Sequence, residues 1–195
     1  MAKDQMFSEM NQAALARLAG RDPKEIARNG GVSYDETTQT FHISTMGMEI
    51  RVHYPEYTMT PELPGWHRLV ILHYLDLADG FPLTGKEIPF AQMRYGMVRG
   101  GGIDRRCELA LQNLNVERLE GICRRIGGQR IASNADTAWR IPFLPRFPVT
   151  LKMWLADEEF PASGRLLPDA GADHYLTIED GVTVAEILLE AITGR

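Results

Sequence analysis

The N-terminal part of the chain has apolar residues at every third or fourth position, which predicts helix. This spacing is shared by Phe7, Met10, Ala14 and Leu18. The pattern predicts a first helix that ends at Gly20. A second, short helix is expected from Asp22 to Asn29, because Asp22 is an N-cap acceptor and Pro23 occupies the first helical position. Two glycines follow and end it.

The apolar period then changes from about 3.6 to 2, which predicts strands with one buried face. The alternating apolar positions are Phe41, Ile43, Ile50, Val52 and Tyr54. Met46-Gly47 lies between the two runs and can adopt the positive φ that a tight hairpin requires. With residues 32–34 ahead of them, these runs predict a three-stranded antiparallel meander, with His42 and His53 on its solvent face.

Residues 66–79 predict a helix that is apolar on almost every side and stops at Gly80. Such a helix should lie centrally, and prolines 55, 61 and 64 mark the connection that precedes it. His73 lies within this helix. It is either a core histidine with one hydrogen-bond partner or a ligand or acid–base group.

Two further apolar stripes at helical spacing predict helices between residues 103 and 126. Cys107 and Cys123 fall on the apolar faces, where burial makes a thiol a poor nucleophile. The Gly100-Gly101-Gly102 run precedes the first stripe. It is either a flexible joint or a turn that could hold phosphate at a helix start, although it lacks the lysine of a P-loop.

The C-terminal third returns to alternating strands, at residues 139–143 and 149–153, with a proline-rich corner between them. A last helix is expected to begin with a capping box of Thr183 and Glu186 and to end at Gly194. Strands and helices thus occur in separate runs, which predicts an α+β fold. We expect a single globular domain over residues 1–195, with antiparallel sheet packed against the central apolar helix and the C-terminal helix.

Composition excludes several classes of protein. With 195 residues, 44% hydrophobic and 24% charged, the chain is typical of a soluble globular protein. Its net charge of −5 argues against nucleic acid as a partner. No apolar run is long enough to predict a membrane span, and no secretory leader is apparent, so we expect a cytoplasmic protein. Two cysteines are too few for an iron–sulfur cluster or a four-cysteine zinc site.

The charge is unevenly distributed. Residues 94–130 contain eight arginines and four acidic residues, whereas residues 157–180 contain seven acidic residues and only Arg165 as a base. Two such blocks of opposite charge can face each other or form two separate solvent-exposed surfaces. Alternatively, the arginine-rich block forms a basic groove for an anionic ligand.

The acidic block includes three adjacent carboxylates that follow a predicted strand: Asp157, Glu158 and Glu159. Two carboxylates close together raise one pKa, which suits proton transfer, or they bind a hard divalent cation. Trp154 beside them could stack on a ligand. The alternative is an acidic turn that caps a helix and pairs with the arginine-rich helices. Asp169 and the Asp173-His174 pair could add ligands.

Several motifs resemble those of a bacterial and archaeal family, domain-of-unknown-function family 3786. They are His73-Tyr74-Leu75, Gly80, Pro82-Leu83-Thr84-Gly85, Phe90, Leu144-Pro145-Arg146, Pro148, Trp154, Asp157-Glu158-Glu159-Phe160-Pro161-Ala162, Leu166-Leu167, Asp169, Tyr175-Leu176 and Glu179-Asp180. The similarity covers most of the chain and is weakest before residue 60. It implies a shared fold and no established activity. Some family members look joined to an iron–sulfur domain, but this chain lacks the cysteines and we expect no cluster on it.

Three classes of function remain open. The first is an accessory protein that binds a small molecule or serves a metal-cofactor pathway, with a pocket near residues 154–161. Its candidate ligand-binding residues are Trp154, Asp157, Glu158, Glu159, His73, Tyr74 and Asp169. The second is a small hydrolase or lyase-type enzyme that uses a carboxylate pair, with or without a divalent metal. The third is a protein-interaction module that uses the charge asymmetry.

Overall fold

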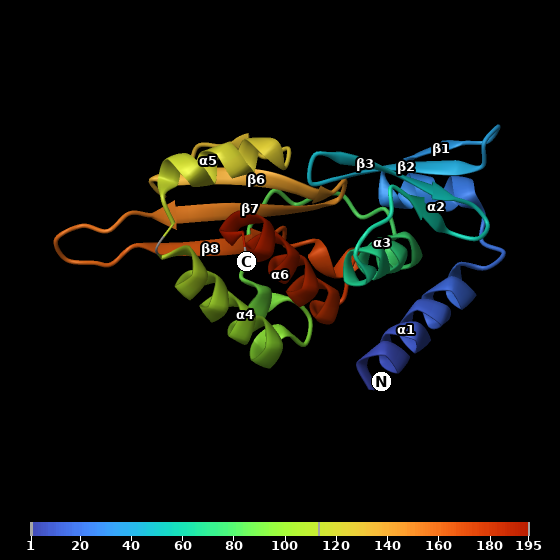
Figure 1. Cartoon of the computed structure of the whole chain (residues 1–195), viewed down its shortest axis with the longest axis horizontal. Coiled ribbons are helices and arrows are strands. Elements are labelled where there is room, and N and C mark those ends of the chain that lie inside the picture. Colours follow the sequence, from blue (N-terminus) through green and yellow to red (C-terminus); the bar gives the residue numbers. More distant parts are fainter. Residues whose placement is uncertain (1, 113, 195) are drawn as a thin grey trace.

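The computed structural model describes residues 2–112 and 114–194 (Figure 1). Its helices are α1 (Ala2–Leu18), α2 (Pro23–Gly30), α3 (Gly65–Leu77), α4 (Gly96–Leu111), α5 (Val116–Arg125) and α6 (Ile178–Thr193). Its strands are β1 (Ser33–Asp35), β2 (Thr40–Thr45), β3 (Met48–His53), β4 (Thr58–Thr60), β5 (Gln129–Arg130), β6 (Thr137–Leu144), β7 (Phe147–Trp154) and β8 (Ser163–Pro168). Two short 3-10 helices, η1 (Phe90–Gln92) and η2 (Ala172–His174), complete the described elements.

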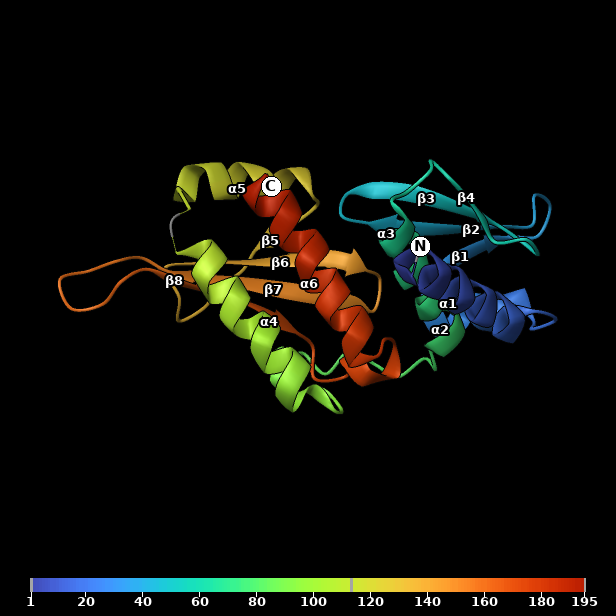
Figure 2. The same ribbon diagram turned by 60° about the horizontal axis from the view of Figure 1, so that its bottom comes forward.

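The strands form two antiparallel sheets, ordered β1-β2-β3-β4 and β5-β6-β7-β8, which confirms the predicted α+β class. Figures 1 and 2 show the N-terminal sheet with α1, α2 and α3 at one end of the long axis. The C-terminal sheet lies at the other end with α4, α5 and α6. Helix α3 contacts α6 and strand β2 contacts β6, so the two halves meet along these elements.

The N-terminal sheet is the predicted meander with one more strand. Met46 and Gly47 both have positive φ, 48° and 76°, and form the expected tight hairpin. Strand β4 pairs with β3 from Arg51↔Thr60 to His53↔Thr58. It was missed because it is three residues long and is followed by Pro61, a residue that sheets tolerate at an edge.

The C-terminal sheet extends through the proline-rich corner. Pro142 pairs with Pro148, and the chain reverses between Leu144 and Phe147. Strands β5 and β8 were not predicted. In β8, Gly164 lets α4 approach closely, because a Cβ at this position would lie 2.5 Å from Cβ of Leu111.

The glycine run lies inside α4 and not before it, so it forms neither a joint nor a phosphate-binding turn. Helix α4 begins at Gly96, and its glycines allow close packing on η1. A Cβ at Gly100 would lie 2.4 Å from the carbonyl carbon of Phe90, whereas Gly101 and Gly102 have nothing within 4 Å. Close backbone packing at Gly100, not flexibility, therefore explains why glycine is accommodated here.

The predicted cap of the last helix was also wrong. Helix α6 begins at Ile178, and its capping box is formed by Thr177 and Asp180. Thr183 lies within the helix and donates a hydrogen bond to the carbonyl of Glu179 at 3.0 Å. Thr177-x-x-Asp180 and Thr183-x-x-Glu186 have the same spacing of capping-box residues, so spacing alone does not distinguish the two starts. The predicted end at Gly194 is confirmed.

Burial of the two cysteines is as predicted, and desolvation raises the pKa of each thiol to about 12. The two charge blocks meet in part where α4 packs against α6, because Arg99 lies 3.5 Å from Glu179. Arg106 of the basic block lies 2.5 Å from Glu186, which is outside the acidic block. In the part of the chain that is described, no helix combines the length and the apolar character needed to cross a membrane.

Candidate functional site

The predicted site residues lie in two separate regions. Trp154 ends β7, and Asp157, Glu158 and Glu159 follow in the long β7–β8 loop, which projects from the body of the molecule at the far end from α3 (Figure 1). His73 and Tyr74 lie in α3, and Asp169 follows β8. The structure therefore does not bring the acidic loop together with the other three residues.

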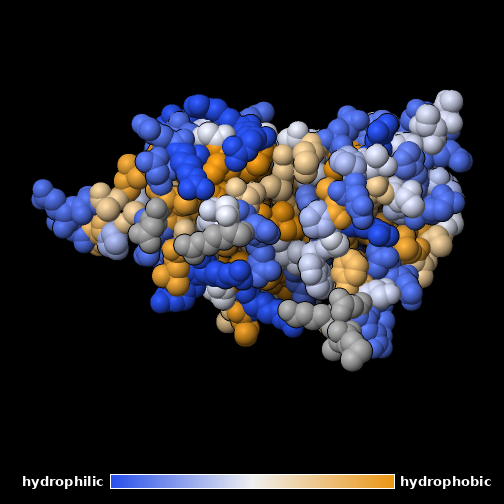
Figure 3. All heavy atoms as spheres, viewed as in Figure 1, coloured by the Kyte–Doolittle hydropathy of each residue, from blue (hydrophilic) through white to orange (hydrophobic). Residues whose placement is uncertain are grey.

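The β7–β8 loop exposes all three of its carboxylates. Asp157 Oδ1 accepts hydrogen bonds from the backbone of Phe160 at 2.7 Å and of Glu159 at 2.9 Å, and these bonds lower the Asp157 pKa. This direction is opposite to the rise expected for a buried carboxylate pair. Phe160 is 66% exposed, and Figure 3 shows a hydrophilic tip with hydrophobic residues behind it. Trp154 is covered by the Arg165 guanidinium, 6.0 Å from the ring centroid.

His73 joins two helices. Its Nδ1 lies 2.6 Å from Oδ1 of Asp180, and both side chains are largely buried. The second oxygen of Asp180 accepts from the backbone and hydroxyl of Thr177 at the start of α6. Both oxygens of this carboxylate are thus occupied by structural partners. His73 therefore has the environment of a core histidine with one hydrogen-bond partner, the first of the two alternatives considered from the sequence.

Tyr74 is fully buried at a junction between the two halves. Its hydroxyl donates to the carbonyl of Gly30 at 2.6 Å and accepts from the backbone of Arg146 at 2.9 Å. Its ring stacks on Tyr175 with a centroid distance of 5.7 Å. Arg146 in turn donates to the carbonyls of Gly80 and Phe81. These family-motif residues hold the end of α3 against the β6–β7 turn.

Asp169 binds the segment that follows α3. Its carboxylate accepts from the backbone and hydroxyl of Thr84 at 3.1 and 2.9 Å, and from the backbones of Gly85 and Gly171, each at 2.8 Å. Although partial burial opposes ionisation, these bonds lower the Asp169 pKa. The contacts fix the loop before η1 in place.

A cleft of about 330 Å³ opens beside these motif residues, between the end of α3, the start of α4 and the start of α6. It is lined by Leu77, Asp79, Arg94, Tyr95, Asp173, His174, Leu176, Thr177, Ile178 and Glu179. We call this cavity the His174 cleft. At its wall, Nδ1 of His174 lies 2.6 Å from Oδ2 of Asp79. Phe81 stacks on the imidazole with a centroid distance of 3.8 Å.

The hydrogen bonding of the cleft orients this pair. Partial burial opposes ionisation of Asp79, but the hydrogen bonds from His174 and from the backbone of Phe81 outweigh it and lower the Asp79 pKa. An ionised carboxylate only accepts, so Nδ1 of His174 donates. The other ring nitrogen, Nε2, has no protein hydrogen-bond partner among the described residues. The pair therefore has one nitrogen free to bind a ligand or exchange a proton.

The opposite rim of the cleft holds an unusual residue. Tyr95 precedes α4 with a φ of 61°, a left-handed conformation that is costly for a side chain with a Cβ, and it is 88% exposed. Asp173 fixes this turn, because both of its oxygens lie 3.0 Å from the backbone nitrogen of Arg94. An exposed aromatic side chain at a cleft mouth can stack on a bound molecule.

Sequence reasoning included His174 only as a possible additional ligand and did not identify Asp79. The two residues are 95 positions apart, and no local spacing connects them. Asp79 stands directly before the Gly80 that ends the helix pattern, so its sequence context indicates only a helix stop. The contact arises from the η2 turn.

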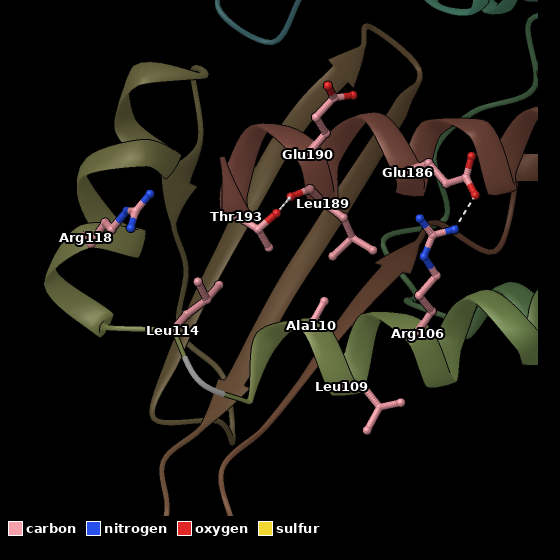
Figure 4. Close-up of a pocket in the computed structure, with 9 residues that line it drawn as sticks. All are labelled: Arg106, Leu109, Ala110, Leu114, Arg118, Glu186, Leu189, Glu190 and Thr193. Atoms are coloured by element: carbon pink, nitrogen blue, oxygen red, sulfur yellow. Dashed lines mark hydrogen bonds and ion pairs between the residues drawn. The ribbon is translucent and has the colours of Figure 1, made fainter. Parts of the chain in front are cut away.

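A second hollow, of about 600 Å³, lies between α4, α5 and α6 (Figure 4). Its charged lining residues are Arg106 and Glu186, which pair across it, together with Arg118 of α5 and Glu190 of α6. Opposite charges are thus already present on both walls. Among the described residues, no three His, Cys, Asp or Glu side chains cluster closely enough to hold a metal ion.

Comparison with known proteins gives one result. The model of the family described as Domain of unknown function (DUF3786) matches residues 22–191. No curated protein and no solved structure matched. The match spans most of the chain, from α2 to within α6, and includes the His174 cleft. The chain belongs to the DUF3786 family.

Proposed function

We propose that this protein binds a small polar molecule in the His174 cleft. The observation that carries the proposal is the His174–Asp79 pair, which is oriented by a 2.6 Å hydrogen bond and stacked against Phe81, and whose Nε2 has no hydrogen-bond partner among the described residues. A concave site with a few convergent polar groups beside apolar side chains is typical of ligand pockets. The cleft volume of about 330 Å³ suits a small metabolite.

The charges of the cleft favour a ligand with a cationic group. Three carboxylates line it, from Asp79, Asp173 and Glu179, against the single arginine Arg94. Asp173 accepts from the backbone of Arg94, and Asp79 accepts from His174 and from the backbone of Phe81, but each carboxylate oxygen has a second lone pair for a bound molecule. Glu179 is less occupied, because its Oε1 lies 3.5 Å from Arg99. We infer that an amine would contact these carboxylates, with Tyr95 packed over its apolar part.

Titration with small amines tests this proposal. Spermidine, putrescine and histamine would be added to the ¹⁵N-labelled protein, with citrate as an anionic comparison, while the histidine side-chain resonances are followed. We expect saturable shifts of the His174 resonances with at least one amine and at least tenfold weaker binding in His174→Gln and Asp79→Asn. His42→Gln is the matched control, because His42 contacts Glu49 in a similar histidine–carboxylate pair on the N-terminal sheet. Absence of amine binding, or unchanged affinity in His174→Gln, would contradict the proposal.

A second candidate function rests on the β7–β8 loop. It carries three exposed carboxylates, and Leu155 and Phe160 are exposed apolar residues beside them. Exposed aromatic residues next to charge are common at protein–protein contacts. We propose that this loop contacts a partner with a basic surface and a small apolar pocket.

A pull-down comparison tests the loop. Wild-type protein would be compared with Phe160→Ser and with the triple change of Asp157, Glu158 and Glu159 to their amides. We expect one retained partner that is lost in both variants and at high salt. Exposed Glu56 is a control position, and Glu56→Gln should leave retention unchanged. A partner that both loop variants retain would bind elsewhere on the protein.

A further inference from the structure

A third cavity, of about 550 Å³, lies between α1, α3 and α6, on the other side of Glu179 from the His174 cleft. Most of its wall is apolar, from Met6 and Met10 of α1, Trp66, Leu69 and Val70 of α3, and Val182 of α6. We call it the α1 cavity. Its volume lies in the range of cavities that hold small ligands.

The wall contributed by α1 is adaptable. Methionine side chains are unbranched and flexible and fit ligands of varied shape. The fully buried side chains described for α1 are Ala14 and Leu18, in its C-terminal half. Its N-terminal half lies over α3 through Phe7, whose ring meets Trp66 edge to face at 5.3 Å. Helix α1 also lies outside residues 22–191, which match the family model, so this wall of the cavity is not part of the matched region.

The polar rim of the cavity has one cation with unused donors. Arg99 is largely exposed, and its Nη1 lies 3.5 Å from Glu179, beyond the distance of a strong charge-assisted hydrogen bond. A guanidinium has five N–H donors, so most of them remain available. Asp180 also lines the cavity, but both of its oxygens are taken by His73 and Thr177. Arg99 is therefore the group on this rim that is best placed to hold a ligand.

We propose that the α1 cavity binds an anionic amphiphile, a molecule with an apolar body and a carboxylate or sulfonate end. The apolar body lies among Met6, Met10, Trp66 and Val182, and the anionic end contacts Arg99 in place of Glu179. The two cavities share Glu179, but Arg99 and Val182 do not line the His174 cleft, so substitutions at these two positions test the α1 cavity separately from amine binding.

Fluorescence titration of the full chain tests the site, with 1-anilinonaphthalene-8-sulfonate as the anionic probe. We expect saturable binding of one probe per chain, and displacement of the probe by decanoate. Arg99→Gln should weaken probe binding at least fivefold through loss of the guanidinium. Val182→Trp should weaken it at least tenfold because the larger side chain fills the cavity, and Met10→Trp provides the same test from the opposite wall.

The controls separate this site from other causes of probe binding. Arg105→Gln removes an exposed arginine of the same helix, and Met97→Trp adds a ring on an exposed face, so both should leave affinity unchanged. His174→Gln should also leave it unchanged, which distinguishes failure here from failure of the amine proposal. Circular dichroism melting would verify that each variant folds. Unchanged affinity in Arg99→Gln, or displacement by decyltrimethylammonium as effective as by decanoate, would overturn the proposal.

Discussion

His67 is a titratable residue that the fold keeps neutral. Its side chain is 5% exposed, its Nε2 lies 3.0 Å from the hydroxyl of Thr45, and its ring stacks on Phe143 at 5.3 Å. Burial lowers the His67 pKa from 6.5 to about 4. Between these two values the unfolded chain binds a proton that the folded chain does not.

Stability should therefore fall as the pH falls from 6.5 towards 4. Each pKa unit corresponds to about 1.4 kcal/mol, so this histidine destabilises the folded state at pH 4 by on the order of 3 kcal/mol relative to pH 7. His67→Gln keeps a partner for Thr45 and removes the titration, and its free energy of unfolding should depend less steeply on pH in this range. Urea unfolding at several pH values measures the difference. Equal slopes in wild type and His67→Gln would contradict the assignment.

Residue-scale chemistry was partly predictable from the sequence. The alternation that placed His42 on the outer face of a strand, and the helical spacing that buried Cys107, both depend on local periodicity, which the chain displays directly. The pairs His73–Asp180 and Asp79–His174 depend on residues 107 and 95 positions apart. No local pattern encodes such distances, so the cleft could not be located from one sequence.

At the scale of elements, glycines were the main source of error. A glycine run suggests a break in a helix because glycine costs backbone entropy there. In α4 that cost is offset by packing, since Gly96 and Gly100 let the helix backbone approach Phe90 and Ala91. Gly181 has the same effect in α6, where it faces Met93 and Phe90. Long, uninterrupted patterns such as α3 were predicted well because nothing opposed their local preference.

Alanine substitutions within the α4 glycine run should have opposite effects. A Cβ at Gly100 would lie 2.4 Å from the Phe90 backbone, so Gly100→Ala should lower the free energy of unfolding by about 1–3 kcal/mol or more. At Gly101 the space is open, and Gly101→Ala should raise it by about 0.5–1 kcal/mol through its higher helix propensity. Thermal and urea denaturation measure both. Stabilisation by both substitutions would mean that α4 does not pack on η1 as described.

At the scale of the whole molecule, the two sheets are joined by a polar junction around Tyr74 as well as by apolar packing. The Tyr74 hydroxyl connects the end of α2, through Gly30, to the β6–β7 turn, through Arg146. Arg146 also reaches the carbonyls of Gly80 and Phe81 beyond α3. Elements from both halves of the chain therefore depend on the same side chains, and we expect both sheets to unfold together as one domain.

Tyr74→Phe tests this coupling. The change leaves the Gly30 carbonyl and the Arg146 backbone nitrogen without their partner, and each such group costs about 1–3 kcal/mol when it is buried. We expect a single unfolding transition in wild type and in the variant. In the variant the transition should occur at lower urea, with the free energy of unfolding reduced by about 2–4 kcal/mol. Tyr54→Phe is the matched control, because no hydrogen bond of the Tyr54 hydroxyl is found among the described residues, and it should shift the transition little. Unfolding would be followed by tryptophan fluorescence and by far-ultraviolet circular dichroism, and the two curves compared. The fluorescence reports on Trp66 near the N-terminal sheet and on Trp139 and Trp154 in the C-terminal sheet. Two separate transitions, with only one of them moved by Tyr74→Phe, would mean that the sheets unfold as independent units and that Tyr74 stabilises only one of them.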